Sequence, residues 1–133
     1  MELNELLPEV LSMECKLFTK MDSYRLIEQK CDKKCLAPDE KQRLNVDIHY
    51  VFSWLIKTVT AACPNLTEDD IVFCCLEKTG LDSITICHCM GCISKQAVNQ
   101  RKYRIKKKMH EAHCDDLFEL IFPCHSSPVT CHY

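Results

Sequence analysis

Three cysteines and a histidine fall within the six residues CHCMGC, from Cys87 to Cys92. Thiol and imidazole groups at such short spacing suit either a zinc site or a redox-active thiol. A structural zinc site needs four converging ligands, and only Cys89 and Cys92 have the C-x-x-C spacing. Cys87 and Cys89 would point about 200° apart on a helix, so they do not easily share one ion. We therefore predict no metal site and interpret these cysteines as reduced, small residues of a scaffold.

Redox sensing and catalysis are the remaining chemical alternatives for this chain. A thiolate beside basic residues has a lowered pKa, so a redox-sensing thiol stays open as an alternative. The chain has no nucleotide-binding glycine loop, no G-x-S-x-G elbow and no H-E-x-x-H sequence, and its six histidines are scattered. We predict that the protein is not an enzyme and uses no cofactor.

A basic run between Ser94 and Met109 is the second concentration of chemically useful side chains. It contains seven lysines and arginines and no acidic residue, whereas the rest of the chain has ten basic and 19 acidic residues. Basic runs are often solvated helix faces, but they also attract the phosphates of DNA. An acidic remainder disfavours indiscriminate contact with nucleic acid. This asymmetry favours double-stranded DNA as the partner.

The elements that position these residues are predicted to be helices. With 47% hydrophobic residues, two glycines and five prolines, the composition favours an all-α fold over a turn-rich β-sandwich. We expect one helix to begin near Pro8, a short one to run from Asp22 to about Gln29, and a third to begin at Pro38 and end at Cys63. The third helix has one apolar face, formed by Leu44, Ile48, Val51, Leu55, Val59 and Ala62.

The next two helices carry clear end signals. Thr67 and Asp70 have the spacing of a capping box at a helix start. Gly80 is placed where that helix should stop. Asp82 or Ser83 can cap the short helix that follows.

The basic run is predicted to form the next helix, capped by Ser94 and running from Lys95 to about Glu111. A last apolar segment, residues 117–122, is expected to pack back as a short helix, and residues beyond Pro123 to form a loose tail. The core-facing side of the basic helix is predicted to contain Val98, Ile105 and Met109.

The segment from Leu66 to Met109, a third of the chain, resembles the LuxR-type (GerE) helix-turn-helix of bacterial transcription regulators. LTEDD looks like the opening L-T-x-x-E of that family, and Ile93-Ser94 looks like the I-S pair before its recognition helix. Ile105 to Met109 looks like the closing I-x-x-K-L. Further matching positions are Gly80, Ile86, Cys87 at the family's alanine, Met90 and Ala97-Val98.

Two departures from the family pattern concern the helix before the basic run. The turn Met90-Gly91-Cys92-Ile93 is one residue longer than the usual L-x-I, which affects the angle between the two helices. Ile84 and Thr85 replace a polar K-E pair, so that a polar anchor is lost or Ile84 becomes an exposed apolar contact.

The resemblance implies sequence-specific DNA binding by a bacterial transcriptional regulator. It places base contacts near Asn99, Gln100 and Tyr103, and amide side chains can pair bidentately with an adenine edge. The lysines of the same helix are expected to meet phosphates, which orient the helix without determining sequence. The predicted DNA-binding residues are Lys95, Gln96, Asn99, Gln100, Lys102, Tyr103, Lys106 and Lys107.

We divide the chain into a helical lead-in (residues 1–65), a DNA-binding helix-turn-helix (66–112) and a packed short segment with a loose tail (113–133). The first helix has an apolar stripe that either packs on the rest of the protein or forms a homodimer through the N-terminal helices. Two helix-turn-helix units in a dimer would contact half-sites about one helical turn apart. The stripe consists of Leu3, Leu7, Val10, Leu17, Met21 and Tyr24.

The start of the chain, MELNELLPEV, lacks the basic and apolar regions of a signal peptide. No apolar run reaches the roughly 18 residues that cross a membrane. We predict a cytoplasmic protein with no membrane partner. The main alternative function is a helical protein-interaction or adaptor module that has lost DNA binding, which exposed apolar residues at Ile84 and 117–122 would support.

Overall fold

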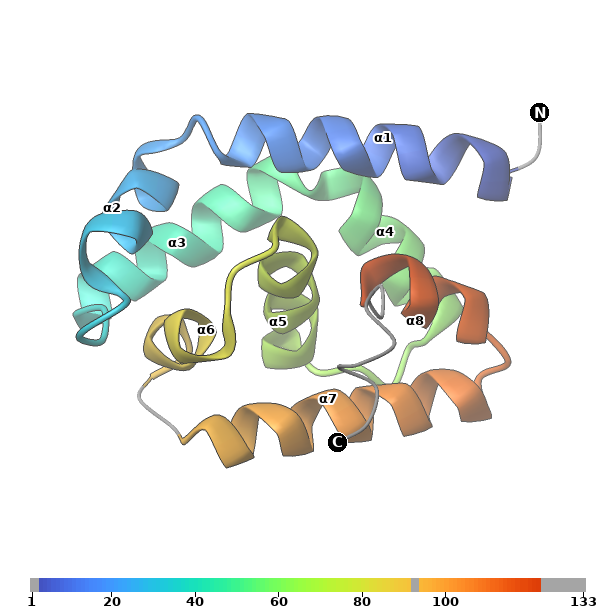
Figure 1. Cartoon of the computed structure of the whole chain (residues 1–133). Coiled ribbons are helices and arrows are strands. Elements are labelled where there is room, and N and C mark those ends of the chain that lie inside the picture. Colours follow the sequence, from blue (N-terminus) through green and yellow to red (C-terminus); the bar gives the residue numbers. More distant parts are fainter. Residues whose placement is uncertain (1–2, 92–93, 123–133) are drawn as a thin grey trace.

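The computed structural model describes residues 3–91 and 94–122, with side chains from residue 8 onward, and within these ranges every element is a helix (Figure 1). The predicted all-α fold class is confirmed. The helices are α1 (Leu3–Phe18), α2 (Asp22–Lys30), α3 (Pro38–Val51), α4 (Ser53–Ala62), α5 (Glu68–Thr79), α6 (Ser83–Cys89), α7 (Lys95–Glu111) and α8 (Asp115–Ile121).

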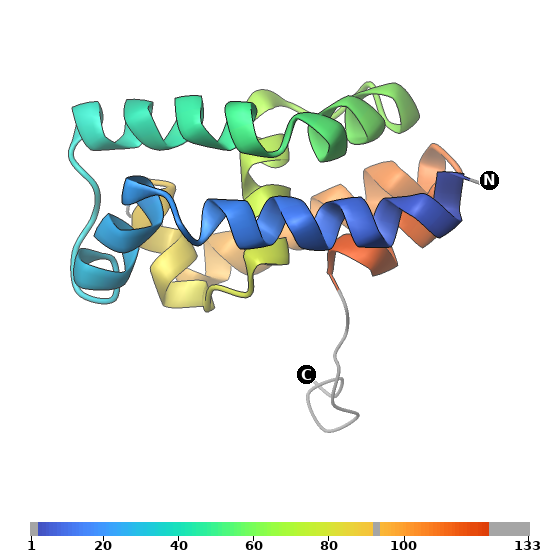
Figure 2. The ribbon, with the colours of Figure 1, turned by 90° about the horizontal axis from the view of Figure 1, so that it is seen from above.

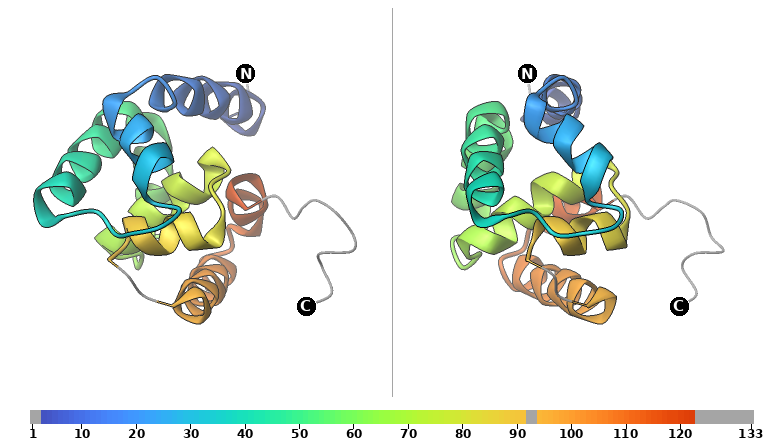
Figure 3. Two further views of the ribbon diagram at one scale, coloured as in Figure 1. Left: turned by 60° about the vertical axis from the view of Figure 1, so that its left-hand side comes forward. Right: turned by 90° about the vertical axis from the view of Figure 1, so that its left-hand side faces the viewer.

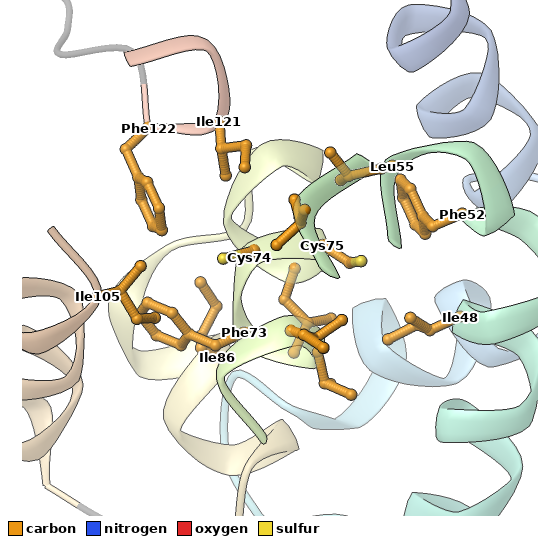
Figure 4. Close-up of a cluster of buried hydrophobic side chains, with 14 of the residues drawn as sticks. Ile48, Phe52, Leu55, Phe73, Cys74, Cys75, Ile86, Ile105, Ile121 and Phe122 are labelled. Carbon is orange, nitrogen blue, oxygen red and sulfur yellow. The ribbon is translucent and has the colours of Figure 1, made fainter. Parts of the chain in front are cut away.

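Helix α5 lies at the centre, with α1 along the top of the molecule and α7 along the bottom (Figure 1). Six consecutive residues of α5, 71–76, are buried, as expected for a helix that is enclosed on all sides. Figure 4 shows side chains from the surrounding helices meeting Phe73 and Cys75: Ile48 and Leu55 on one side, Ile105 on the other.

The lead-in and the following helices share one hydrophobic core. Buried residues from α1 through α8 belong to a single cluster, and α3 and α4 both contact α5. Seen from above, α1 runs beside α3 and α4 and covers this core (Figure 2).

The predicted helix ends are confirmed where the signals are local. Pro38 is in the first turn of α3. The Thr67 hydroxyl accepts the Asp70 N–H at 3.1 Å, and the Asp70 carboxylate accepts the Thr67 N–H at 3.0 Å, which completes the capping box. Gly80 ends α5 in the left-handed conformation, with φ +93°. Asp82 caps α6 by accepting the Thr85 N–H at 2.8 Å.

The prediction of a single helix from Pro38 to Cys63 is wrong. The segment forms two helices, α3 and α4, which are separated at Phe52. The Glu14 carboxylate of α1 accepts the N–H groups of Trp54 and Leu55 at 2.8 and 3.2 Å. Glu14 therefore acts as an N-terminal cap of α4, although it is far from that helix in the sequence. Glu14 is only 7% exposed. The indole Nε1 of Trp54 is buried and has no hydrogen-bond partner in the part of the chain that the structure describes.

The predictions for the first helix need correction. Helix α1 begins at Leu3 and contains Pro8, rather than starting near Pro8. Its buried side chains are Leu11, Glu14 and Phe18. Phe18 packs on the Phe52 ring, with ring centroids 5.5 Å apart. The face of α1 that contains Leu11, Glu14 and Phe18 therefore packs against the core. From the predicted stripe, Leu17 is 56% exposed, Val10, Met21 and Tyr24 are half-buried, and the side chains of Leu3 and Leu7 lie outside the described part.

The prediction that residues 117–122 pack back as a short helix is confirmed by α8. Leu117, Phe118, Ile121 and Phe122 are all buried, and α8 contacts both α5 and α7. The Phe118 and Phe122 rings stack with centroids 4.4 Å apart. The predicted tail beyond Pro123 lies outside the described residues.

Candidate nucleic-acid interface

Helix α7 forms the lower edge of the molecule, and one side of it faces away from the rest of the chain (Figure 3). Ser94 caps the helix, because its Oγ accepts the Ala97 N–H at 3.0 Å. The predicted core face is confirmed, since Val98, Ile105 and Met109 are buried. Because these three residues face the core, the opposite side of the basic helix faces solvent.

One flank of α7 is held by Asp70 of α5. The two carboxylate oxygens bind Arg101 Nη1 at 2.7 Å and Lys108 Nζ at 3.0 Å. Asp70 is only 3% exposed. Its burial by itself would raise the pKa of the carboxyl, but hydrogen bonds from the Thr67 backbone and the Lys108 ammonium lower the pKa below its ordinary value. One carboxylate thus binds α7 at Arg101 and at Lys108, which are two helical turns apart. These two contacts fix the rotation of α7 about its axis.

The other flank of α7 is covered by α8. Lys102 Nζ lies 5.6 Å from the centre of the Phe122 ring, and Lys106 Nζ lies 5.8 Å from the centre of the Phe118 ring. These are cation–π distances. The structure therefore places Lys102 and Lys106, two of the predicted phosphate contacts, at the α8 edge of the helix rather than on its outermost side.

The outward side of α7 brings together all three of the predicted base contacts, Asn99, Gln100 and Tyr103. They line an open hollow of about 380 Å³. Tyr103 projects from it and is 68% exposed. Arg104 also lines this hollow, although it was not among the predicted DNA-binding residues. Its spacing of four residues from Gln100 places both on one helix face, which is the signal that identifies it. The hollow is lined by Gln96, Asn99, Gln100, Tyr103 and Arg104.

The positive charges of α7 are divided between structural contacts and solvent. Arg101 and Lys108 are paired with Asp70. Arg104 and Lys107 are exposed and make no hydrogen bond or ion pair within residues 3–91 and 94–122. Lys95 is exposed in the first turn and interacts electrostatically with Asp82. The free charge therefore lies along the same side as the polar hollow.

The CHCMGC segment contributes to the scaffold. Cys87 and Cys89 are buried in α6, and Cys92 lies outside the described residues. Burial raises the pKa of the Cys31 and Cys89 thiols. This direction is opposite to the lowered pKa that a redox-sensing thiol would need. Among the described residues, no three histidine, cysteine or acidic side chains are arranged to hold a metal ion.

The two departures from the LuxR-type pattern lie in α6 and in the turn that follows it. Ile84 is 43% exposed, whereas Thr85 is buried and lies at the capped end of the helix. Beyond the helix, Gly91 adopts φ +108°, a conformation that other residues rarely take. The last two residues of the longer turn, Cys92 and Ile93, lie outside the described part.

Comparisons of the chain with protein-family models, with characterised proteins and with solved structures found no match in any of the three. The likeness to LuxR-type regulators thus stays a prediction carried by the residues themselves. In the described part of the chain, none of the helices combines the length and the apolar character needed to cross a bilayer.

Proposed function

We propose that the protein binds double-stranded DNA through the outward side of α7 and acts as a transcriptional regulator with a LuxR-like helix-turn-helix. The observation that carries this proposal is the sorting of side chains around α7. Apolar residues face the core, Asp70 and α8 hold the two flanks, and the outward side presents amides, a tyrosine and unpaired cations.

The outward side has the chemistry that a major groove requires. Asn99 and Gln100 can donate to and accept from the edge of an adenine, with each good pair discriminating by about 1–3 kcal/mol. Arg104 and Lys107 are available for phosphates or guanine edges because no carboxylate neutralises them within the described residues. The helix is also preorganised, since its three buried residues and Asp70 fix its rotation.

Selection of duplexes from a random pool tests this proposal, followed by fluorescence anisotropy with the selected and random sequences. We expect preference for the selected duplex to be lost in Asn99→Ala and Gln100→Ala. The Glu111→Ala variant, at the far end of the same helix, is a matched control that should keep that preference. Absence of any enrichment in the pool would refute DNA recognition.

A protein-interaction module is the second candidate function. The exposed apolar pairs Met13 and Leu17 of α1, and Val46 and Tyr50 of α3, favour it, as does Ile84. The other expected support is weakened, because Leu117, Phe118, Ile121 and Phe122 are buried rather than exposed. Binding of random duplex at low salt separates the two candidates, since an adaptor without DNA affinity gives no salt-dependent signal.

The proposed homodimer needs a different surface if it is to contact two neighbouring half-sites. Helices α1 and α7 lie on opposite sides of the molecule (Figure 1). A dimer formed through the outer side of α1 would point its two α7 helices away from each other, and one straight duplex could not reach both. DNA binding by one chain at a single half-site fits this arrangement. Sedimentation of the protein with a duplex that carries one half-site measures the stoichiometry.

A further inference from the structure

The connection between α2 and α3, followed by the first turn of α3, contacts the last turn of α6. The connecting chain crosses directly beside α6 (Figure 3, right). The Leu36 N–H donates to the His88 carbonyl oxygen at 3.3 Å, and the His88 ring donates to the Cys31 carbonyl oxygen. The Cys31 thiol lies close enough to the Cys89 thiol to raise its pKa. Three contacts from the lead-in thus fall on two consecutive residues of α6.

Lys41 of α3 adds a charged contact one residue further along. Its Nζ donates to the Met90 carbonyl oxygen at 3.3 Å, and a side chain added at Gly91 would lie 3.5 Å from the same Nζ. Met90 is the C-terminal cap of α6. A lysine at a helix C-terminus satisfies a carbonyl that the helix leaves unpaired and complements its negative end.

We infer that Lys41 is a positioning residue for DNA recognition, because it fixes the start of the turn that connects α6 to α7. This inference rests on the proposed function. The turn is one residue longer than the family pattern that it resembles, which affects the angle between the two helices. Lys41 supplies, from outside the helix-turn-helix, a restraint on Met90, where this turn begins. The lead-in is therefore part of the DNA-binding unit.

The experiment uses the full chain and two lysine variants. Lys41→Met keeps most of the side-chain stem and removes the ammonium. Lys33→Met is the matched control, because Lys33 is exposed on the connection that precedes α3. We expect Lys41→Met to lower the ratio of selected-duplex to random-duplex affinity about tenfold, the effect of one lost charge-assisted hydrogen bond. Lys33→Met should leave the ratio unchanged.

The salt dependence distinguishes positioning from direct phosphate contact. A phosphate-contacting lysine would lower the slope of log affinity against log salt by about one unit and weaken all sequences alike. We expect the slope and the random-duplex affinity to be unchanged in Lys41→Met. A lower slope with an unchanged ratio overturns the inference. Lys41→Arg, which keeps a donor and the charge, should restore the ratio and guards against a general loss of folding.

Amide hydrogen exchange without DNA tests the restraint independently of the proposed function. We expect Lys41→Met to speed exchange of the Met90 and Ala97 amides, at the end of α6 and the start of α7, while the Phe73 amide of α5 is unchanged. If wild type shows no DNA preference but exchange responds in this way, the DNA function fails and the restraint stands. If exchange at Met90 and Ala97 is the same in Lys41→Met and Lys33→Met, the inference is wrong.

Discussion

Asp70 and Glu14 are two buried carboxylates that each serve the N-terminus of a helix, yet their surroundings differ. Asp70 caps its own helix α5 and binds two cations of α7. Glu14 reaches from α1 to the start of α4 and binds two backbone N–H groups. Burial raises the pKa of Glu14 despite these hydrogen bonds, whereas the pKa of Asp70 is lowered.

The comparison separates two ways of connecting helices through a buried charge. Around Asp70 the charge is compensated by cations, so the ionised carboxylate stabilises the position of α7. Around Glu14 the compensation comes from peptide dipoles, and the ionised form is partly penalised by its burial. The first arrangement fixes the proposed DNA-binding helix. The second caps α4 after the break at Phe52 and connects α1 to it.

Replacing Asp70 should give the largest effect on stability. Asp70→Asn leaves Arg101 and Lys108 beside an uncharged amide, and we expect a loss of about 3 kcal/mol in the free energy of unfolding, typical of a broken buried ion pair. Urea denaturation followed by circular dichroism measures the loss. Asp69→Asn is the matched control, because Asp69 is exposed in the same helix turn. Equal losses in the two variants would mean that Asp70 does not anchor α7.

Removing the carboxylate of Glu14 should cost less. Glu14→Ala leaves the N–H groups of Trp54 and Leu55 without an acceptor, and we expect a loss of about 2 kcal/mol. Glu14→Gln keeps one acceptor oxygen and should lose less. The same urea titration measures both. Glu9→Ala on the exposed side of α1 serves as the control, and a loss of the same size there would contradict the role of Glu14 as a cap.

The pH dependence should have opposite signs at the two sites. The stability from Asp70 is complete above its ordinary pKa of 3.8 and is lost as the pH falls through the lower pKa of the folded state. The part of the Glu14 contribution that depends on its protonation is complete below its ordinary pKa of 4.5 and is lost as the pH rises through the raised pKa.

The free energy of unfolding of wild type, Asp70→Asn and Glu14→Gln between about pH 3 and 6 measures this difference. The stability advantage of wild type over Asp70→Asn should grow as the pH rises. The advantage of wild type over Glu14→Gln should shrink over the same range. Curves that change in the same direction would remove the distinction between the two carboxylates.

The smallest expected effect on stability concerns Arg104, which has no acidic partner in the described chain. Arg104→Gln should change the free energy of unfolding by less than about 0.5 kcal/mol. It should nevertheless weaken DNA binding and lower the salt slope by about one unit. Arg101→Gln is the counterpart, because Asp70 uses this charge structurally, and it should destabilise the protein. Anisotropy measures DNA binding and urea titration measures stability for both variants. Together they test whether the ion pair with Asp70 keeps Arg101 from contacting phosphates.

Local signals were sufficient to predict α5, α6 and α7. Thr67, Gly80 and Ser94 act within four residues of themselves, so their effect can be inferred from spacing alone. The apolar face of α7 followed from Val98, Ile105 and Met109 in the same way. The outward side was therefore largely predictable, except that Arg104 was missed.

The remaining features depend on residues far apart in the sequence. Glu14 interrupted an apolar stripe, and nothing near it indicated that its partners lie 40 and 41 residues away. That contact caps α4 after the break at Phe52, and the sequence predicted one helix instead of two. Lys41 and Met90 are 49 residues apart, and no helical periodicity links them. The position of α8 similarly decides that Lys102 and Lys106 lie at the edge of α7.

Trp54 gives the protein an optical reporter of its own. It is the single tryptophan of the chain, its backbone N–H donates to Glu14, and its indole N–H is buried without a partner among the described residues. Its emission therefore responds to the contact between α1 and α4 and to water that reaches the indole. Helix α7 lies on the far side of the core from α1 (Figure 1). Unlabelled protein can thus report by fluorescence whether the N-terminal helix lifts while the opposite surface is occupied.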